Sequence, residues 1–117
     1  MFSRTSGSTT CGAPDLAKLT FYGHATFGIE TDDGVRLVID PFFGDNPVCD
    51  HPVADVEADF ILLTHGHYDH VADAIPLAER TGATIIASYE LATFFEQKGL
   101  TVSRRGLAVG SPIFLDM

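Results

Sequence analysis

The chain has 117 residues, of which 45% are hydrophobic, and its formal net charge is −9 at pH 7. This length fits one small domain, and no apolar run is long enough to cross a membrane. Sixteen acidic residues against seven basic ones would repel a phosphate backbone, so we expect no nucleic-acid partner. The first residues lack the cationic and apolar regions of a signal peptide, which leads us to expect a cytoplasmic protein.

The first half of the chain predicts an antiparallel sheet. Residues 1–16 are mostly small and polar, so we expect a disordered extension there. Residues 19–22, 25–31 and 35–40 are rich in β-branched and aromatic side chains, as strands require. The pair Gly23-His24 separates the first two runs, and Asp33-Gly34 predicts a tight hairpin with positive-φ residues between the next two.

The second half predicts strands alternating with helices. Residues 59–64 form a short apolar run typical of a buried strand. Asp73 can then cap a helix that ends at Gly82, with Pro76 tolerated in its first turn. A further strand over 83–88 and a second helix ending before Gly99 complete the predicted order βββ, β, α, β, α.

The chemistry is concentrated in residues 64–70, which read Thr-His-Gly-His-Tyr-Asp-His. Residues two apart in an extended segment point the same way, so His65 and His67 can face one metal ion. Asp69 and His70 follow and could serve a second ion. Imidazole and carboxylate suit Zn²⁺ and are acceptable to Fe or Mn. The expected reaction is attack of metal-bound hydroxide on an ester, lactone, amide or phosphoester. The competing interpretation, adventitious metal binding by a histidine-rich loop, accounts poorly for so demanding a spacing.

Residues 65–70, HGHYDH, resemble the H-x-H-x-D-H signature of the metallo-β-lactamase superfamily. The segments FYGHA at 21–25, IDPF at 39–42 and THGH at 64–67 resemble its UlaG-like branch of metal-dependent hydrolases, which includes an ascorbate-phosphate lactonase. The similarity covers about residues 17–100. It implies a small-molecule substrate and usually two zinc ions.

The resemblance also assigns roles to individual residues. His65 and His67 would hold the first ion, and Asp69 and His70 the second, with Asp69 as the catalytic carboxylate. Asp40 would support the ligand loop by orienting an imidazole or a backbone group; alternatively it is only a turn carboxylate before Pro41. His24 matches a position at the rim of the site, where it would be a second supporting residue or simply solvated.

The chain also departs from the superfamily pattern. A complete member is an αββα sandwich whose second half supplies another histidine, a bridging aspartate and a last histidine, but no histidine follows His70 here. We therefore expect an α+β fold: the N-terminal half of the sandwich, a mixed sheet with two helices on one face, followed by a divergent tail at 101–117. Such a chain is either a hydrolase, truncated and of doubtful activity, or a non-catalytic half-domain that folds only with a partner. A homo-oligomer through the exposed apolar sheet face is one such assembly. A thioester hydrolase, nuclease or redox relative is a third interpretation.

Overall fold

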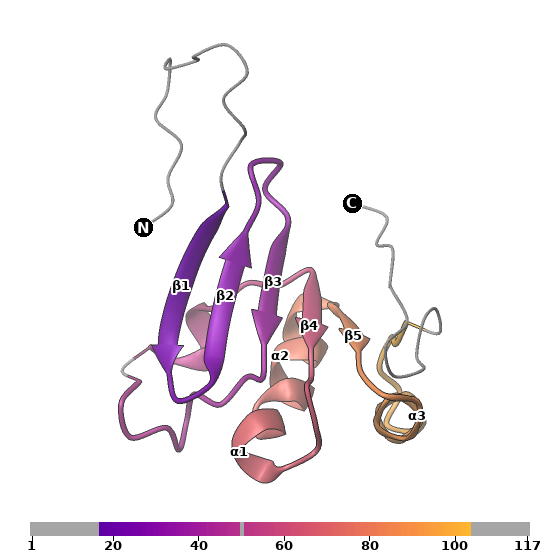
Figure 1. The fold of residues 1–117 in the computed structure, drawn as a ribbon. Coiled ribbons are helices and arrows are strands. Elements are labelled where there is room, and N and C mark those ends of the chain that lie inside the picture. Colours follow the sequence, from indigo (N-terminus) through magenta and orange to yellow (C-terminus); the bar gives the residue numbers. More distant parts are fainter. Residues whose placement is uncertain (1–16, 50, 104–117) are drawn as a thin grey trace.

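The computed structural model describes residues 17–49 and 51–103. The predicted disordered extension and most of the predicted tail lie outside these residues. The elements, in chain order, are β1 Lys18–Gly23, β2 Thr26–Glu30, β3 Arg36–Ile39, the 3₁₀ turn η1 Val53–Asp55, β4 Phe60–Leu62, α1 Tyr68–Val71, α2 Ala74–Thr81, β5 Thr84–Ile86 and α3 Tyr89–Gln97 (Figure 1).

The five strands form one sheet in the order β1-β2-β3-β4-β5. The first two pairings are antiparallel, whereas β3–β4 and β4–β5 are parallel. Short turns suffice for antiparallel neighbours, but parallel neighbours need crossovers, and α1 and α2 supply the one between β4 and β5. The predicted α+β class and mixed sheet are confirmed. Beyond β5, Val102 forms a parallel bridge to Ile85, so residues 101–103 continue the sheet.

Both hairpin turns differ in detail from their predictions. The first is centred on His24 and Ala25, because Gly23 still belongs to β1. In the second, only Gly34 has positive φ, at 86°, and its N–H donates to the Thr31 carbonyl at 2.9 Å. This is a longer hairpin loop closed by a left-handed glycine, not the expected two-residue turn with positive φ at both positions.

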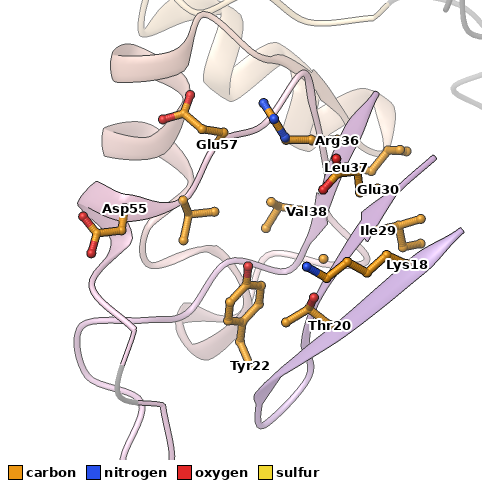
Figure 2. A pocket seen from close by; sticks show the side chains of 12 residues that line it. Lys18, Thr20, Tyr22, Ile29, Glu30, Arg36, Leu37, Val38, Asp55 and Glu57 are labelled. Carbon is orange, nitrogen blue, oxygen red and sulfur yellow. The ribbon is translucent and has the colours of Figure 1, made fainter. Parts of the chain in front are cut away.

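A hollow of about 230 Å³ lies where the segment containing η1 faces β1, β2 and β3 (Figure 2). Its lining includes Lys18, Tyr22, Arg36, Asp55 and Glu57. Burial raises the pKa of Tyr22, and the neighbouring Cys49 adds to that effect. None of the predicted metal-site residues lines this hollow, so it is separate from the histidine cluster.

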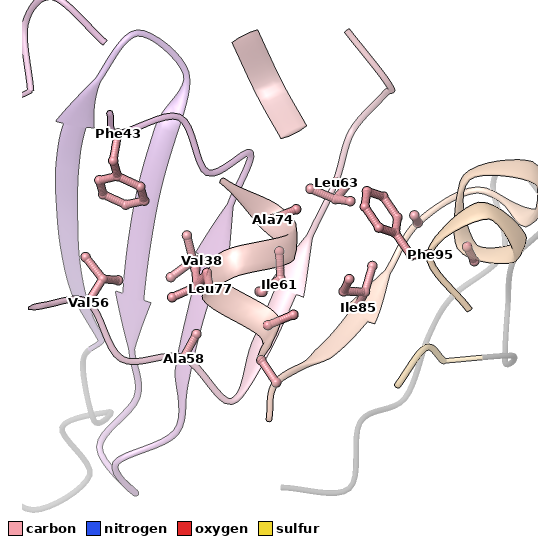
Figure 3. Packing of buried hydrophobic residues seen from close by; sticks show 14 residues of the cluster. Val38, Phe43, Val56, Ala58, Ile61, Leu63, Ala74, Leu77, Ile85 and Phe95 are labelled. Carbon is pink, nitrogen blue, oxygen red and sulfur yellow. The ribbon is translucent and has the colours of Figure 1, made fainter. Parts of the chain in front are cut away.

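The hydrophobic core lies between one face of the sheet and the helices (Figure 3). Val38, Ile61 and Ile85 are register partners on three adjacent strands, so their side chains share this face. Leu77 of α2 is fully buried, and Phe95 of α3 is 2% exposed in the same cluster. Helices α2 and α3 thus pack into one core, as predicted for the two helices.

Asp73 stands at the N-cap position of α2, as predicted, but its side chain does not cap the helix. Its Oδ2 instead accepts hydrogen bonds from the backbone N–H groups of Phe43 and Gly44, at 2.6 and 3.1 Å. Those amides lie in an irregular loop and have no strand partner, so the carboxylate satisfies them. The helix ends as expected at Gly82, whose φ is 75°.

The opposite face of the sheet carries two apolar rows that cross the strands. Register places the members of each row on the same side, alternating with the core residues. Leu19 and Phe21 on β1 remain 44% and 62% exposed. One row is Leu19, Ile29, Leu37 and Phe60; the other is Phe21, Phe27, Ile39, Leu62 and Ile86.

Candidate metal centre

The candidate site forms where the parallel strands β3 and β4 end. Both strands run in the same direction, so the residues that follow them meet at one edge of the sheet. Asp40 follows β3, and Thr64 begins the loop that leads from β4 to α1. His67 is the residue before α1, which places Asp69 and His70 within this short helix.

Asp40 connects these two strand ends through its buried carboxylate. The residue is 2% exposed and has a φ of 49°, a left-handed conformation that Asp tolerates better than most residues. Its Oδ1 accepts from the Thr64 N–H at 2.8 Å, and its Oδ2 accepts from the Thr64 hydroxyl at 2.6 Å and from His70 Nδ1 at 2.9 Å. The carboxylate thus fixes the start of the ligand loop and one of its imidazoles.

The same bonds determine which ring nitrogens carry hydrogen. An ionised carboxylate only accepts, so His70 Nδ1 must be protonated. The single hydroxyl hydrogen of Thr64 is given to Asp40, so at 2.9 Å from His65 Nδ1 the hydroxyl oxygen accepts and that nitrogen is also protonated. In neutral imidazoles, Nε2 of both His65 and His70 then has a free lone pair, which is the state a metal ion requires.

The predicted ligands lie close together, with one exception. The rings of His65 and His70 are 4.1 Å apart, and Asp69 Oδ1 is 3.7 Å from His70 Nε2. His24, at the β1–β2 turn, places its Nε2 3.1 Å from Asp69 Oδ2. The His67 ring lies 4.5 Å from that of His65 but belongs to neither three-residue group with closely spaced ligand atoms.

Two groups of three residues have ligand atoms within 4.8 Å of one another. One is His24, Asp69 and His70; the other is Asp40, His65 and His70. In the second group both oxygens of Asp40 already accept hydrogen bonds, one of them from His70 itself. We therefore regard Asp40 as a support for the ligands and the first group as the arrangement open to an ion.

The rim of the site includes Tyr68, which is 63% exposed. Its hydroxyl donates a short hydrogen bond to Asp45, and this bond, together with the negative charge of Asp45, raises the pKa of the phenol. His65 and His67 are also exposed. The ligand loop is therefore accessible from solvent.

Thr64 is the residue whose role the sequence reasoning missed. Thr64 belongs to the motif, but the motif alone indicates no role for its side chain. A hydroxyl directly before the first histidine was the available signal, but its two bonds depend on Asp40, 24 positions away.

A mixed sheet that presents histidines and a carboxylate at one edge defines the class of a candidate metal-binding domain. The family can be stated as well: the chain belongs to the β-lactamase superfamily, since the family model described as "Beta-lactamase superfamily domain" matches residues 18–105. The predicted superfamily is thus confirmed.

Individual proteins to which the chain is similar carry names consistent with this family. The chain is 52% identical over 96 residues to a "UPF0173 metal-dependent hydrolase" of Heliobacterium modesticaldum, covering 81% of this chain and 39% of the relative. It is 46% identical over 83 residues to one of Methanosphaera stadtmanae, covering 71% and 36%. The solved structure of Igni18, a metallo hydrolase from Ignicoccus hospitalis, superposes with a TM-score of 0.75 at 34% identity, covering 85% of this chain and 42% of that one.

The chain therefore spans about two fifths of the length of these relatives. Among the described residues, no helix has the length and apolar character needed to span a bilayer.

Proposed function

We propose that this chain is the metal-binding part of a hydrolase that cleaves an ester, lactone, amide or phosphoester bond in a small molecule. The observation that carries the proposal is the hydrogen-bond network of Asp40. Through Thr64 and directly, Asp40 leaves the Nε2 atoms of His65 and His70 unprotonated, which is the tautomer in which an imidazole can bind a metal ion through Nε2. Membership of the metal-dependent hydrolase family supports the same function.

Zinc fits the donor set best. The cluster offers imidazole nitrogen and carboxylate oxygen without a thiolate, and Mn or Fe would accept the same atoms. His65 and His67 would hold a first ion, and Asp69 and His70 a second. A bound ion of this kind lowers the pKa of water and polarises the scissile group.

Asp69 is the carboxylate to which we assign a catalytic role. Its side chain is 46% exposed, whereas that of Asp40 is 3% exposed and engaged by three donors. Asp69 can therefore face both an ion and a substrate, while Asp40 acts by holding the imidazoles in place. His24, beside Asp69, completes this side of the site.

The proposal is tested by loading the full chain with zinc and screening ester, lactone, amide and phosphoester substrates. The double variant His65→Ala/His67→Ala removes the first pair of ligands, and His51→Ala is the matched control, because His51 lies outside both potential ligand groups. We expect hydrolysis that the double variant loses and the control keeps. Turnover that persists in the double variant would refute a role for this centre.

A second candidate function is that of a non-catalytic half-domain that assembles through its apolar sheet face. The observation that favours it is the pair of apolar rows, in which Leu19 and Phe21 remain 44% and 62% exposed. Phe21 packs against Phe27 with ring centroids 4.9 Å apart, so two aromatic rings lie side by side at the exposed end of this face. Faces of this kind favour association, and we propose a second copy of the chain as the partner.

Light scattering coupled to size exclusion tests this assembly. We expect a dimer for the wild type and a monomer for Phe21→Lys, with Phe94→Lys as the control because Phe94 is 47% exposed on α3, away from the rows. A monomeric wild type at high concentration is the result that excludes self-association.

A further inference from the structure

We propose that His24 is a direct metal ligand, so that His24, Asp69 and His70 form a three-ligand site. This inference rests on the proposed metal-dependent function and assigns His24 a different role from the supporting one suggested by the sequence. The three residues come from the β1–β2 turn and from α1, which lie 45 positions or more apart in the chain but meet at the site.

One donor atom from each of His24, Asp69 and His70 lies within 4.8 Å of the other two, a spacing that three ligands of one ion can have. Zinc held at about 2.0–2.1 Å in a tetrahedron has ligand atoms separated by roughly 3.4 Å. His24 Nε2 is 3.1 Å from Asp69 Oδ2, and Asp69 Oδ1 is 3.7 Å from His70 Nε2. The two imidazoles thus approach different oxygens of the Asp69 carboxylate, and the rings of His24 and His70 lie 5.1 Å apart.

The turn that carries His24 is held in place from both sides. Thr26 is fully buried, and its hydroxyl donates to the Asp40 carbonyl at 2.7 Å and accepts from the Phe42 N–H at 3.1 Å. On the other side, the Asn46 amide donates to the Gly23 carbonyl at 3.2 Å. The turn is thus tied to the segment that also contains Asp40, the residue that positions His70.

The backbone of His24 is itself unusual. Its φ is 59°, a left-handed conformation that is uncommon for non-glycine residues, although His adopts it more often than most. Its ring packs edge-on against Phe42 at 5.3 Å, which directs the imidazole toward α1. The turn conformation and this ring contact together place the imidazole beside the candidate ligand pair Asp69 and His70.

A third protein ligand beside Asp69 and His70 suits a catalytic zinc ion. Such sites commonly use three protein ligands and leave one position open. Two histidines and one carboxylate form one of the recurrent catalytic sets. Among the described residues, His24 is the group whose position completes such a set.

The competing role for His24 is that of a hydrogen-bond donor to Asp69. Substitution separates the two. In His24→Gln the amide nitrogen can still donate to the carboxylate but coordinates zinc poorly, whereas His24→Ala removes both capacities. His51→Ala is the control for the loss of a histidine that does not belong to the cluster.

The experiment titrates the full chain with Co²⁺, followed by visible absorption, and with Zn²⁺ against a chromophoric chelator. Thermal unfolding checks that each variant is folded. We expect His24→Ala and His24→Gln both to weaken zinc by more than about 100-fold, beyond the roughly 10–100-fold loss typical of removing an outer partner. Both should also change the Co²⁺ spectrum, while His51→Ala should match the wild type.

Three results overturn the inference. A His24→Gln variant with wild-type affinity and spectrum would make His24 a donor to Asp69 only. A His24→Ala variant with wild-type affinity would remove it from the site altogether. Both results leave the proposed hydrolase standing, provided that Asp69→Ala and His70→Ala lose the metal. A wild-type chain that binds no metal would overturn the proposed function together with this inference.

Discussion

Replacing Asp40 by asparagine tests how the site prepares its histidines. Asparagine has the same shape and tolerates the φ of 49°, and its oxygen can still accept from the Thr64 N–H in place of Oδ1. At the position of Oδ2, however, an acceptor becomes an N–H donor. The Thr64 hydroxyl and His70 Nδ1, which now donate to Oδ2 at 2.6 and 2.9 Å, would have to become acceptors.

This single exchange reverses the whole chain of donors. His70 would carry its hydrogen on Nε2, and the reversed Thr64 hydroxyl would impose the same tautomer on His65. Losing one outer partner of a metal-bound histidine typically costs 10–100-fold in affinity, so two affected histidines predict a loss of about 100-fold or more, or roughly 3 kcal/mol. Folding should change by only about 1–2 kcal/mol, because each group keeps a partner.

Long-range ¹H–¹⁵N NMR of the imidazoles reads the tautomers directly, and chelator competition gives the zinc affinity. Urea unfolding serves as the control for stability. If the Asp40→Asn variant keeps hydrogen on Nδ1 of His65 and His70 and binds zinc as the wild type does, the network does not prepare the ligands and the reasoning fails.

Three further predictions concern the network, the core and a turn. Thr64→Val removes the relay to His65 alone, so zinc affinity should fall about 10-fold in chelator competition while Thr64→Ser stays near wild type; equal loss in both would rule out the hydroxyl as the cause. Leu77→Ala empties a fully buried position and should cost 2–5 kcal/mol of unfolding free energy by urea titration, within the range roughly expected for such sites; a loss below about 1 kcal/mol would mean that α2 does not pack as described. Gly23→Ala would place a Cβ 2.5 Å from Val48 at a φ of 106°, so it should destabilise more than Gly34→Ala, where φ is 86° and the space is open; thermal melts that rank the two in the opposite order would contradict the clash.

The strands and helices can be predicted from the sequence because their signals are local. The apolar run at 59–64 and the helical spacing of Leu91, Phe94 and Phe95 follow directly from the sequence, and the structure has a strand and a helix there. The detailed geometry of the Asp33-Gly34 turn was not readable, because the same dipeptide also fits a longer loop closed by one left-handed glycine. The Asp73 carboxylate accepts a hydrogen bond from a loop amide about 30 residues away. No local rule for helix caps predicts such a contact.

The candidate site likewise combines residues that are local in the sequence with partners that are distant. The candidate ligands His65, His67, Asp69 and His70 can be identified from the sequence because they lie within six consecutive positions. The partners that orient them come from distant strand ends, and a hydrogen bond between Asp40 and His70 spans 30 positions. The family resemblance predicts Asp40 near the ligands, but the direction of each hydrogen bond, and with it the tautomer, depends on the three-dimensional arrangement of Asp40, Thr64 and His70.

Zinc stoichiometry and affinity of the purified full chain, compared with the His65→Ala/His70→Ala variant, test the central claim most directly. Elemental analysis gives the first quantity and chelator competition the second. The account predicts stoichiometric zinc in the wild type and none retained by the variant, with both proteins folded by circular dichroism. A folded wild type that takes up no zinc, or a variant that binds zinc as tightly, would contradict it.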